Sequence, residues 1–133
     1  MSLVVDSSVI VVALIDTGPD GVWAEGIIDD QVLYAPEIVR VEVTNVLRRL
    51  ELAKQITTAE ANGAHEDLSQ LEIEHFPFEP FSGRIWELRH TVISYDAWYV
   101  AVAEELGYPL ATLDRRLARS VGPKCRFLTP DSQ

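Results

Sequence analysis

The hydrophobic residues of this 133-residue chain follow two alternating patterns. Short, mostly apolar runs are typical of buried strands, and they occur at residues 3–5, 32–34, 73–76, 110–113 and 126–128. In the longer segments between them, apolar residues recur every three or four positions, which indicates helices packed on a core. Strands that alternate with helices predict a mostly parallel sheet. The pattern therefore predicts an α/β three-layer sandwich, with about four or five short strands flanked by helices on both faces.

The expected helices begin and end at residues with known preferences for helix termini. Pro36 is expected at the first position of a helix, where its missing N–H costs no hydrogen bond. Thr57 and Glu60 have the spacing of a capping box, and Gly107 is expected to end a helix whose buried face includes Tyr99. The expected helices run from Ser7 or Ser8 to about Leu14, from the Gly18–Gly21 turn to about Asp29, from Pro36 to about Ala53, from Thr57 to about Leu71, from Ser82 through Val92, from Ala97 to Leu106 and from Arg115 to about Val121.

Four acidic residues lie at positions from which their side chains are expected to reach one edge of the sheet. Asp6 directly follows the first strand, and Asp114 follows the strand at 110–113. Asp96 precedes the helix that Gly107 ends, and Glu42 lies beside the apolar face of an earlier helix. In open α/β sheets, ligands bind at the edge formed by the carboxyl ends of the strands. We therefore expect the four carboxylates to converge at that edge.

Each acid also has a purely structural interpretation. Asp6, Asp96 and Asp114 each precede an expected helix, and aspartate is among the most favourable N-cap residues. For any one of the three taken singly, the cap is the favoured explanation, and Glu42 taken singly could be a solvated helix residue. The convergence of all four on one edge is what favours a shared site.

A cluster of carboxylates points to a divalent metal ion. Carboxylates within a few ångströms raise one another's pKa unless a cation neutralises them. Oxygen ligands without histidine or cysteine select hard cations, so the sequence predicts Mg²⁺, with Mn²⁺ as a substitute. Such an ion activates water and holds phosphate oxygens, which suits phosphodiester hydrolysis. His65, His75 and His90 lack the spacing of metal ligands and are expected outside the site.

Composition restricts the other possibilities. The chain has no long linker or internal repeat, so residues 1–133 are expected to form a single domain. Cys125 is the only cysteine, which excludes an intramolecular disulfide and favours an intracellular protein. The apolar stretch at residues 3–15 is too short to span a bilayer and is interrupted by Asp6, so we expect neither a membrane anchor nor a signal peptide.

The charge is distributed unevenly along the chain. The net charge of −10 argues against a protein that coats nucleic acid with a uniformly basic surface. Before Leu47 the only basic residue is Arg40, against eight acids, whereas several arginines follow Asp114 closely. Candidate contacts for flanking RNA phosphates are Arg84, Arg115 and Arg116. The alternative for these arginines is a solvated helix face that balances an acidic protein.

Four short motifs occur along the chain in a characteristic order and spacing. They are Val5-Asp6-Ser7-Ser8, then Ala35-Pro36 leading to Glu42-Val43 and Asn45-Val46-Leu47, then Tyr95-Asp96-Ala97 with Tyr99-Val100-Ala101, and Ala111-Thr112-Leu113-Asp114. Together they resemble the PIN-domain nucleases, and closely the VapC toxins of bacterial VapBC toxin–antitoxin pairs. The similarity covers essentially the whole chain.

The resemblance implies a Mg²⁺-dependent endoribonuclease toxin that hydrolyses RNA with metal-activated water. Asp6 and Asp96 would be the principal metal ligands, Asp114 would complete the site, and Glu42 would orient water or a second ion. Three polar residues would hold these acids through hydrogen bonds, and they are Ser8, Asn45 and Thr112. The family also implies a cytoplasmic PIN-like domain that forms a homodimer and is silenced by a cognate VapB-type antitoxin.

Two rival interpretations remain open from the sequence. A catalytically silent PIN-like module would use the same acids to bind a metal or a basic partner segment without turnover. A phospho-receiver domain also combines an acidic pocket with Mg²⁺. That second alternative lacks a convincing phosphoacceptor on a central strand and a well-placed lysine, since Lys54 and Lys124 are the only lysines.

Overall fold

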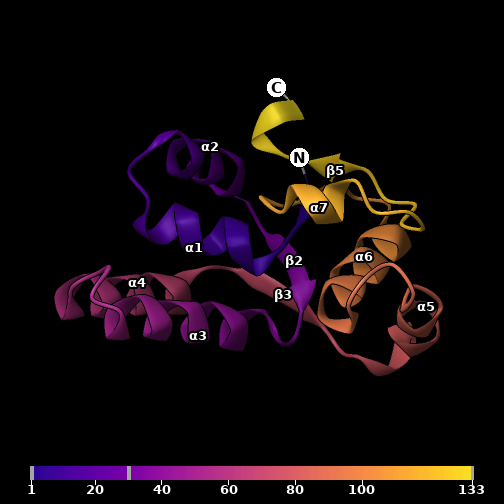
Figure 1. The fold of residues 1–133 in the computed structure, drawn as a ribbon, viewed down its shortest axis with the longest axis horizontal. Coiled ribbons are helices and arrows are strands. Elements are labelled where there is room, and N and C mark those ends of the chain that lie inside the picture. The colour runs from indigo at the N-terminus through magenta and orange to yellow at the C-terminus, as the bar shows by residue number, and fades with distance from the viewer. Residues whose placement is uncertain (1, 30, 133) are drawn as a thin grey trace.

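A computed structural model describes residues 2–29 and 31–132, and in them five parallel strands form one sheet (Figure 1). The strands are β1 (Leu3–Val5), β2 (Leu33–Pro36), β3 (Ile73–Phe76), β4 (Leu110–Ala111) and β5 (Phe127–Leu128). Their order across the sheet is β3-β2-β1-β4-β5, with every neighbouring pair parallel. The predicted α/β architecture is confirmed, and the strands are all parallel rather than mostly so.

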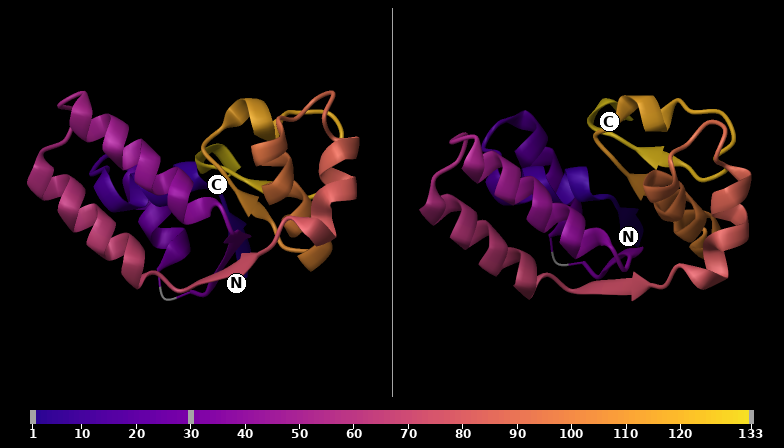
Figure 2. Two further views of the ribbon diagram at one scale, coloured as in Figure 1. Left: turned by 90° about the horizontal axis from the view of Figure 1, so that it is seen from below. Right: turned by 60° about the horizontal axis from the view of Figure 1, so that its bottom comes forward.

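Helices lie on both sides of this sheet. The described residues form α1 (Ser7–Ile15), α2 (Pro19–Ile28), α3 (Val39–Leu52), α4 (Thr58–Gln70), α5 (Ser82–Glu87), α6 (Ser94–Leu106) and α7 (Arg115–Ala118), with 3₁₀ turns at Glu79–Phe81 and Pro130–Ser132. Helices α1 to α4 pack together in one group, while α6 packs against α5 and on β1, β2 and β4. Figure 2 shows the sheet between these two groups. In the described part of the chain, no helix is long and apolar enough to cross a membrane.

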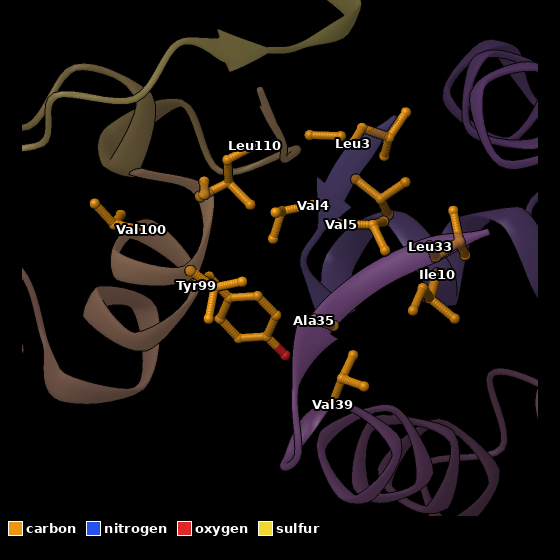
Figure 3. Packing of buried hydrophobic residues seen from close by; sticks show 14 of the residues in the cluster. Leu3, Val4, Val5, Ile10, Leu33, Ala35, Val39, Tyr99, Val100 and Leu110 are labelled. Carbon is orange, nitrogen blue, oxygen red and sulfur yellow. The ribbon is translucent and has the colours of Figure 1, made fainter. Parts of the chain in front are cut away.

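The buried core centres on β1. Leu3, Val4 and Val5 are completely buried, as expected for the central strand of a sheet covered on both faces. Figure 3 shows Leu110 of β4 on one side of β1 and Leu33 of β2 on the other. Because β1 has neighbours on both edges and both faces, the residue that follows it emerges at a fixed point of the molecule.

Several helix termini confirm the signals in the sequence. Thr57 and Glu60 form both bonds of the capping box, with N···O distances of 2.8 and 3.0 Å. Gly107 ends α6 in the left-handed conformation, with φ of 72°, which glycine adopts without steric cost. The helix expected to start at Ser7 or Ser8 is also present, but Asp6 rather than either serine is its N-cap.

Several expected boundaries were wrong, among them the strand expected at 110–113, which ends at Ala111, and the helix expected to reach about Val121, which ends at Ala118. Pro36 ends β2, and α3 starts only at Val39. The pairing of β2 with β1 stops at Tyr34, while its pairing with β3 continues to Pro36. Pro36 therefore lies beyond the part of β2 that pairs with β1, and its missing N–H costs no hydrogen bond to that strand. The helix at Ser82 has no side-chain cap and ends at Glu87 rather than Val92.

Asp96 does not occupy the expected N-cap position. Helix α6 begins at Ser94, so Asp96 lies in its first turn and does not cap it. An acidic side chain in that position still interacts favourably with the partial positive charge of the helix N-terminus. The carboxylate of Asp96 is therefore not committed to a capping hydrogen bond in the way that the other two aspartates are.

Candidate active site

The strand order reverses between β1 and β4. After β3 the chain returns past β1 to form β4 on its other side, with Val5 paired with Ala111. Such a switch point leaves a crevice outside the carboxyl ends of the two strands, where α/β proteins bind ligands. Asp6 follows β1 directly, and Thr112 to Asp114 follow β4. The two strand ends therefore deliver both aspartates to the same edge of the sheet.

Asp6 is a buried carboxylate in which both oxygens accept hydrogen bonds. Only 6% of the residue is exposed. Its Oδ1 accepts from Ser8 Oγ at 2.5 Å and from the N–H of Val9 at 3.2 Å, and its Oδ2 accepts from the hydroxyl of Thr112. Asp6 thus caps α1 and interacts electrostatically with Asp96 at once, so the structural and functional interpretations of this residue are compatible.

Burial controls the ionisation of Asp6. Desolvation raises the pKa of its carboxyl to about 6, although the hydrogen bonds from Ser8 and Thr112 act in the opposite direction. A carboxylate held ionised at neutral pH in such a place is stabilised by a nearby cation. This electrostatic environment is one expected of a metal ligand.

Ser8 and Thr112 also fix the loop that follows β4. The Oγ of Ser8 accepts a bond from the N–H of Leu113 at 3.1 Å, and Thr112 Oγ1 accepts from the N–H of Asp114 at 2.9 Å. Each hydroxyl donates to Asp6 and accepts from this loop. The two hydroxyls therefore fix the backbone of Asp114 relative to the carboxylate of Asp6.

Asp96 and Asp114 complete a group of three neighbouring carboxylates. Burial, followed by the charges of Asp6 and Asp114, raises the pKa of Asp96 to about 6. Asp114 uses Oδ1 to cap α7, accepting from the N–H groups of Arg116 at 3.0 Å and Leu117 at 3.1 Å. Both bonds orient the side chain through Oδ1, and neither of them uses Oδ2.

Glu42 approaches this group from α3. It is half-buried, and burial raises the pKa of its carboxyl, with a further contribution from the charge of Asp96. Tyr99 of α6 donates its hydroxyl to Glu42 Oε1 at 2.5 Å. The predicted convergence of four acids is therefore reflected in their mutual electrostatic interactions.

Tyr99 is the residue of this site that the sequence pattern missed. Helical spacing assigned it to the core, and only 1% of the residue is indeed exposed. Two signals were available. A buried tyrosine hydroxyl needs a hydrogen-bond partner, and Tyr99 lies three residues after Asp96, on the same face of its helix.

The donor chemistry fits a hard divalent cation. Asp6, Asp96, Asp114 and Glu42 supply carboxylate oxygens only, the ligands that Mg²⁺ and Mn²⁺ prefer. Within the described residues, no three histidine, cysteine, aspartate or glutamate side chains are drawn together tightly enough to form a ready-made metal group. The site is therefore best described as converging carboxylates whose charges interact, with Asp6 the most rigidly held of the four.

A pocket of about 270 Å³ adjoins the acids. Asp96 and Asp114 line it together with Arg116. Its remaining lining is Thr91, Val92, Ile93, Leu117 and Ser120. A larger pocket of about 850 Å³, near the end of α2 and the end of α4, contains none of the four acids. The smaller pocket is the one that combines the candidate metal ligands with a positive charge.

The other candidate residues lie in different settings. Arg84 forms a bidentate pair with Glu104, at 2.8 and 3.0 Å, and also donates to the carbonyl of Gly122 at 2.9 Å. Arg115 pairs with Asp131 at 2.6 and 3.3 Å. Both guanidinium groups are thus engaged within the protein. Asn45 is exposed on α3, three residues after Glu42, and its proposed contact with the acids stays a prediction.

Comparison with known proteins places this arrangement in a family. The profile of the PIN domain matches residues 3–122. A relative from Mycobacterium tuberculosis, Ribonuclease VapC1, is 37% identical over 125 residues, which cover 93% of this chain and 94% of that protein. The matched region includes all four acids.

Solved structures share the fold. PAE2754 from Pyrobaculum aerophilum has a TM-score of 0.73 at 20% identity and covers 99% of this chain and 85% of its own. VapBC2 from Rickettsia felis, solved bound to a DNA fragment from their promoter, has a TM-score of 0.64 at 14% identity, with 97% and 98% covered. With the profile match over residues 3–122 and the relative at 37% identity, these findings show that the chain belongs to the PIN-domain family, in the group whose members are named VapC.

Proposed function

We propose that this chain is a Mg²⁺-dependent endoribonuclease toxin, held inactive by a cognate VapB-type antitoxin. The observation that carries the proposal is the placement of Asp6. Its carboxylate is buried at the switch point of the sheet, is oriented by two hydroxyls and interacts electrostatically with Asp96. The likeness to a protein named Ribonuclease VapC1 over 93% of the chain supports RNA as the substrate.

Asp6, Asp96 and Asp114 would hold the metal ion, with Mn²⁺ able to replace Mg²⁺. When bound, such an ion lowers the pKa of water and neutralises phosphate oxygens, which is the chemistry that phosphodiester hydrolysis needs. Ser8 and Thr112 contribute by fixing Asp6, since each donates a hydrogen bond to one of its carboxylate oxygens. Groups that orient a ligand in this way commonly affect metal affinity about 10- to 100-fold.

Glu42 would act on the attacking water. Tyr99 occupies its Oε1, which leaves Oε2 to accept a hydrogen bond from water and to hold that molecule in line with the phosphorus. Hydrolysis by water breaks the bond from phosphorus to the 3′ oxygen. The products of this proposal are a 3′ hydroxyl and a 5′ phosphate, whereas attack by the RNA 2′ hydroxyl would give a cyclic phosphate.

Arg116 is the proposed contact for a flanking phosphate. It lines the pocket beside Asp96 and Asp114, whereas Arg84 and Arg115 are engaged by Glu104 and Asp131. A phosphate bound there would lie next to the metal site, and its charge would be balanced by the guanidinium. The pocket size suits one nucleotide of a single strand or loop, the form in which RNA bases are most accessible to proteins.

The partners follow from the same site. The chain carries a net charge of −10, and four of its acids line one edge of the sheet, so a basic segment of the antitoxin can neutralise them and exclude RNA. The antitoxin would be of the VapB type, and the active form would be a cytoplasmic homodimer. Light scattering of the purified protein, alone and with its antitoxin, measures both assemblies.

Comparison of the wild type with Asp6→Asn tests the function. Both proteins are incubated with total RNA in Mg²⁺, in EDTA, and in EDTA followed by excess Mg²⁺, and new 5′ ends are mapped. We expect specific 5′-phosphate ends from the wild type in Mg²⁺, their loss in EDTA, and their return on addition of metal. Asparagine keeps the size and capping ability of residue 6, so the variant should fold yet lose cleavage.

Two outcomes would contradict the proposal. Equal cleavage by Asp6→Asn would exclude Asp6 as a metal ligand. A wild type that is inert on every RNA, yet binds an arginine-rich peptide tightly, would instead support the non-catalytic module considered from the sequence. Expression of both proteins in cells, with growth and RNA ends recorded together, identifies the RNA that is cut.

A further inference from the structure

The hydrogen bond between Tyr99 and Glu42 crosses the candidate site. Tyr99 lies on α6 and Glu42 on α3, 57 positions apart, and the hydroxyl-to-carboxylate distance is 2.5 Å. Figure 3 shows the hydroxyl of Tyr99 pointing away from its own helix, toward Ala35 of β2 and Val39 at the start of α3. Helix α3 packs on α1 and α4, whereas α6 packs on the sheet and α5, so this bond connects two separately packed helices.

We propose that Tyr99 is a positioning residue that fixes the carboxylate of Glu42 for the reaction. This inference rests on the proposed nuclease function and adds a residue that has no expected contact with metal or RNA. Glutamate on a helix has three rotatable side-chain bonds, and a half-buried carboxylate near Asp96 is repelled by that neighbour. A rigid donor from across the site opposes both effects, because it holds one oxygen and thereby directs the other.

The setting of Tyr99 favours this role over packing alone. A phenylalanine would fill the same space without burying a hydroxyl, so packing does not require the oxygen. Burial, followed by the bond to Glu42, raises the pKa of Tyr99, which keeps its hydroxyl protonated and therefore a donor. The negative charges of Asp6 and Asp96, both members of the proposed site, raise the pKa of Tyr99 further.

Tyr99→Phe tests the proposal with the smallest change. We expect kcat for RNA cleavage to fall about 10- to 100-fold while KM stays within about twofold, since a hydrogen bond to a charged group is removed and no RNA contact is. Tyr108→Phe is the matched control, because the Tyr108 ring packs on Tyr34, 5.2 Å between centroids, and belongs to none of the proposed catalytic contacts. That control should leave kcat and KM unchanged.

A double-mutant cycle distinguishes positioning from a general loss of structure. In a Glu42→Ala background, Tyr99→Phe should cause no further fall in kcat, because the group that it orients is already absent. Multiplicative effects of the two changes on kcat would overturn the proposal. Metal affinity gives a readout that is independent of turnover, and Tyr99→Phe should bind Mn²⁺ as the wild type does. A parallel loss of Mn²⁺ affinity would indicate a collapsed site and would also overturn it.

Failure of the positioning role and failure of the nuclease function give different results. A wild type that cleaves RNA and a Tyr99→Phe variant with the same kcat would overturn the positioning role alone. A wild type that cleaves no RNA would overturn the nuclease function and the positioning role together. Glu42→Gln provides a second variant that keeps the residue's size, and its kcat should fall at least as far as that of Tyr99→Phe.

Discussion

Thr112 donates its hydroxyl to the carboxylate of Asp6, and the two residues are 106 positions apart in the chain. One follows β4 and the other follows β1, the two strands between which the order of the sheet reverses. The bond is buried, and the same hydroxyl accepts the N–H of Asp114 at 2.9 Å. A single threonine thus links the most buried acid of the site to the loop that carries a second one.

Thr112→Val should therefore weaken metal binding without disturbing the fold. Valine has nearly the same shape, but Asp6 Oδ2 loses a donor and the N–H of Asp114 loses an acceptor. We expect Mn²⁺ affinity to fall about 10- to 100-fold, as for other residues that orient metal ligands. The loss of buried hydrogen bonds should also lower the free energy of unfolding by about 1–3 kcal/mol.

Isothermal titration with Mn²⁺ and urea unfolding in EDTA measure these two effects separately. Thr44→Val is the control, since Thr44 is exposed on α3 and has no bond to the four acids among the described residues. It should change neither quantity appreciably. Unchanged Mn²⁺ affinity in Thr112→Val would show that Asp6 needs no support from β4.

The raised pKa of Asp6 predicts how stability depends on pH in the absence of divalent ions. The pKa of Asp6 is about 6 in the folded protein against an ordinary value of 3.8, so between these values the folded state binds a proton that the unfolded state has lost. Stability from this group is greatest below about pH 4 and falls as the pH rises through 6. The shift corresponds to a cost of about 3 kcal/mol at pH 7, because one pKa unit equals about 1.4 kcal/mol.

Urea unfolding in EDTA at about pH 5 and about pH 7.5, on either side of the folded pKa, measures the part of this cost that develops above pH 5. Asp6→Asn cannot ionise, so its free energy of unfolding should vary less between the two conditions than that of the wild type. Asp96 also has a pKa raised to about 6, mainly by burial, and acts in the same direction. A wild type whose stability rises between the two conditions would contradict the assignment.

Much of this site could be predicted because it depends on the ends of strands. A short apolar run followed by aspartate is visible in the sequence at Asp6 and Asp114, and parallel pairing then determines that both side chains meet at one edge. Helix α6 starts at Ser94, three residues before the expected Ala97, because aspartate is so often an N-cap that Asp96 favours a later start even though it lies in the first turn.

The contacts that the sequence did not reveal join residues far apart in the chain. Tyr99 has the spacing of a core residue, and only the packing of α6 across the site from α3 brings its hydroxyl to Glu42. Similarly, the pairing of Arg84 with Glu104 depends on how α5 meets α6. Helical periodicity identifies which face is buried, but it does not identify the polar group that a buried hydroxyl or guanidinium will meet.

Metal binding should stabilise the folded protein in a manner that depends on Asp6. A ligand present at about 100 times its dissociation constant adds about 2.7 kcal/mol to the free energy of unfolding if it binds only the folded state. We expect saturating Mg²⁺ at pH 7.5 to raise the melting temperature of the wild type, where Asp6 is ionised, and to have little effect on Asp6→Asn. The same addition at about pH 5 should act weakly on the wild type, since protons compete with the ion for Asp6 and Asp96.

Differential scanning fluorimetry with and without Mg²⁺ makes this comparison, and NaCl at equal ionic strength controls for general ionic effects. An equal rise in melting temperature for both proteins would place the ion elsewhere on the acidic surface. A rise in the wild type that is as large at low pH as at high pH would exclude the two aspartates with raised pKa values as ligands.

Arg116→Ala should weaken RNA binding while preserving the chemical step. Arg116 lines the pocket next to Asp96 and Asp114, and under the proposed function it would contact a phosphate adjacent to the cleaved one. Removing one phosphate contact should raise KM several-fold with kcat unchanged, and it should reduce the slope of log affinity against log salt by about 0.7, the value for a single-stranded site. Arg115→Ala is a matched control from the neighbouring position, because its exposed pair with Asp131 contributes little and lies outside that pocket. Steady-state kinetics on a short RNA at several salt concentrations separates these cases. Equal effects of the two substitutions would show that both arginines act only through their general positive charge. A fall in kcat for Arg116→Ala alone would instead place its guanidinium at the cleaved phosphate.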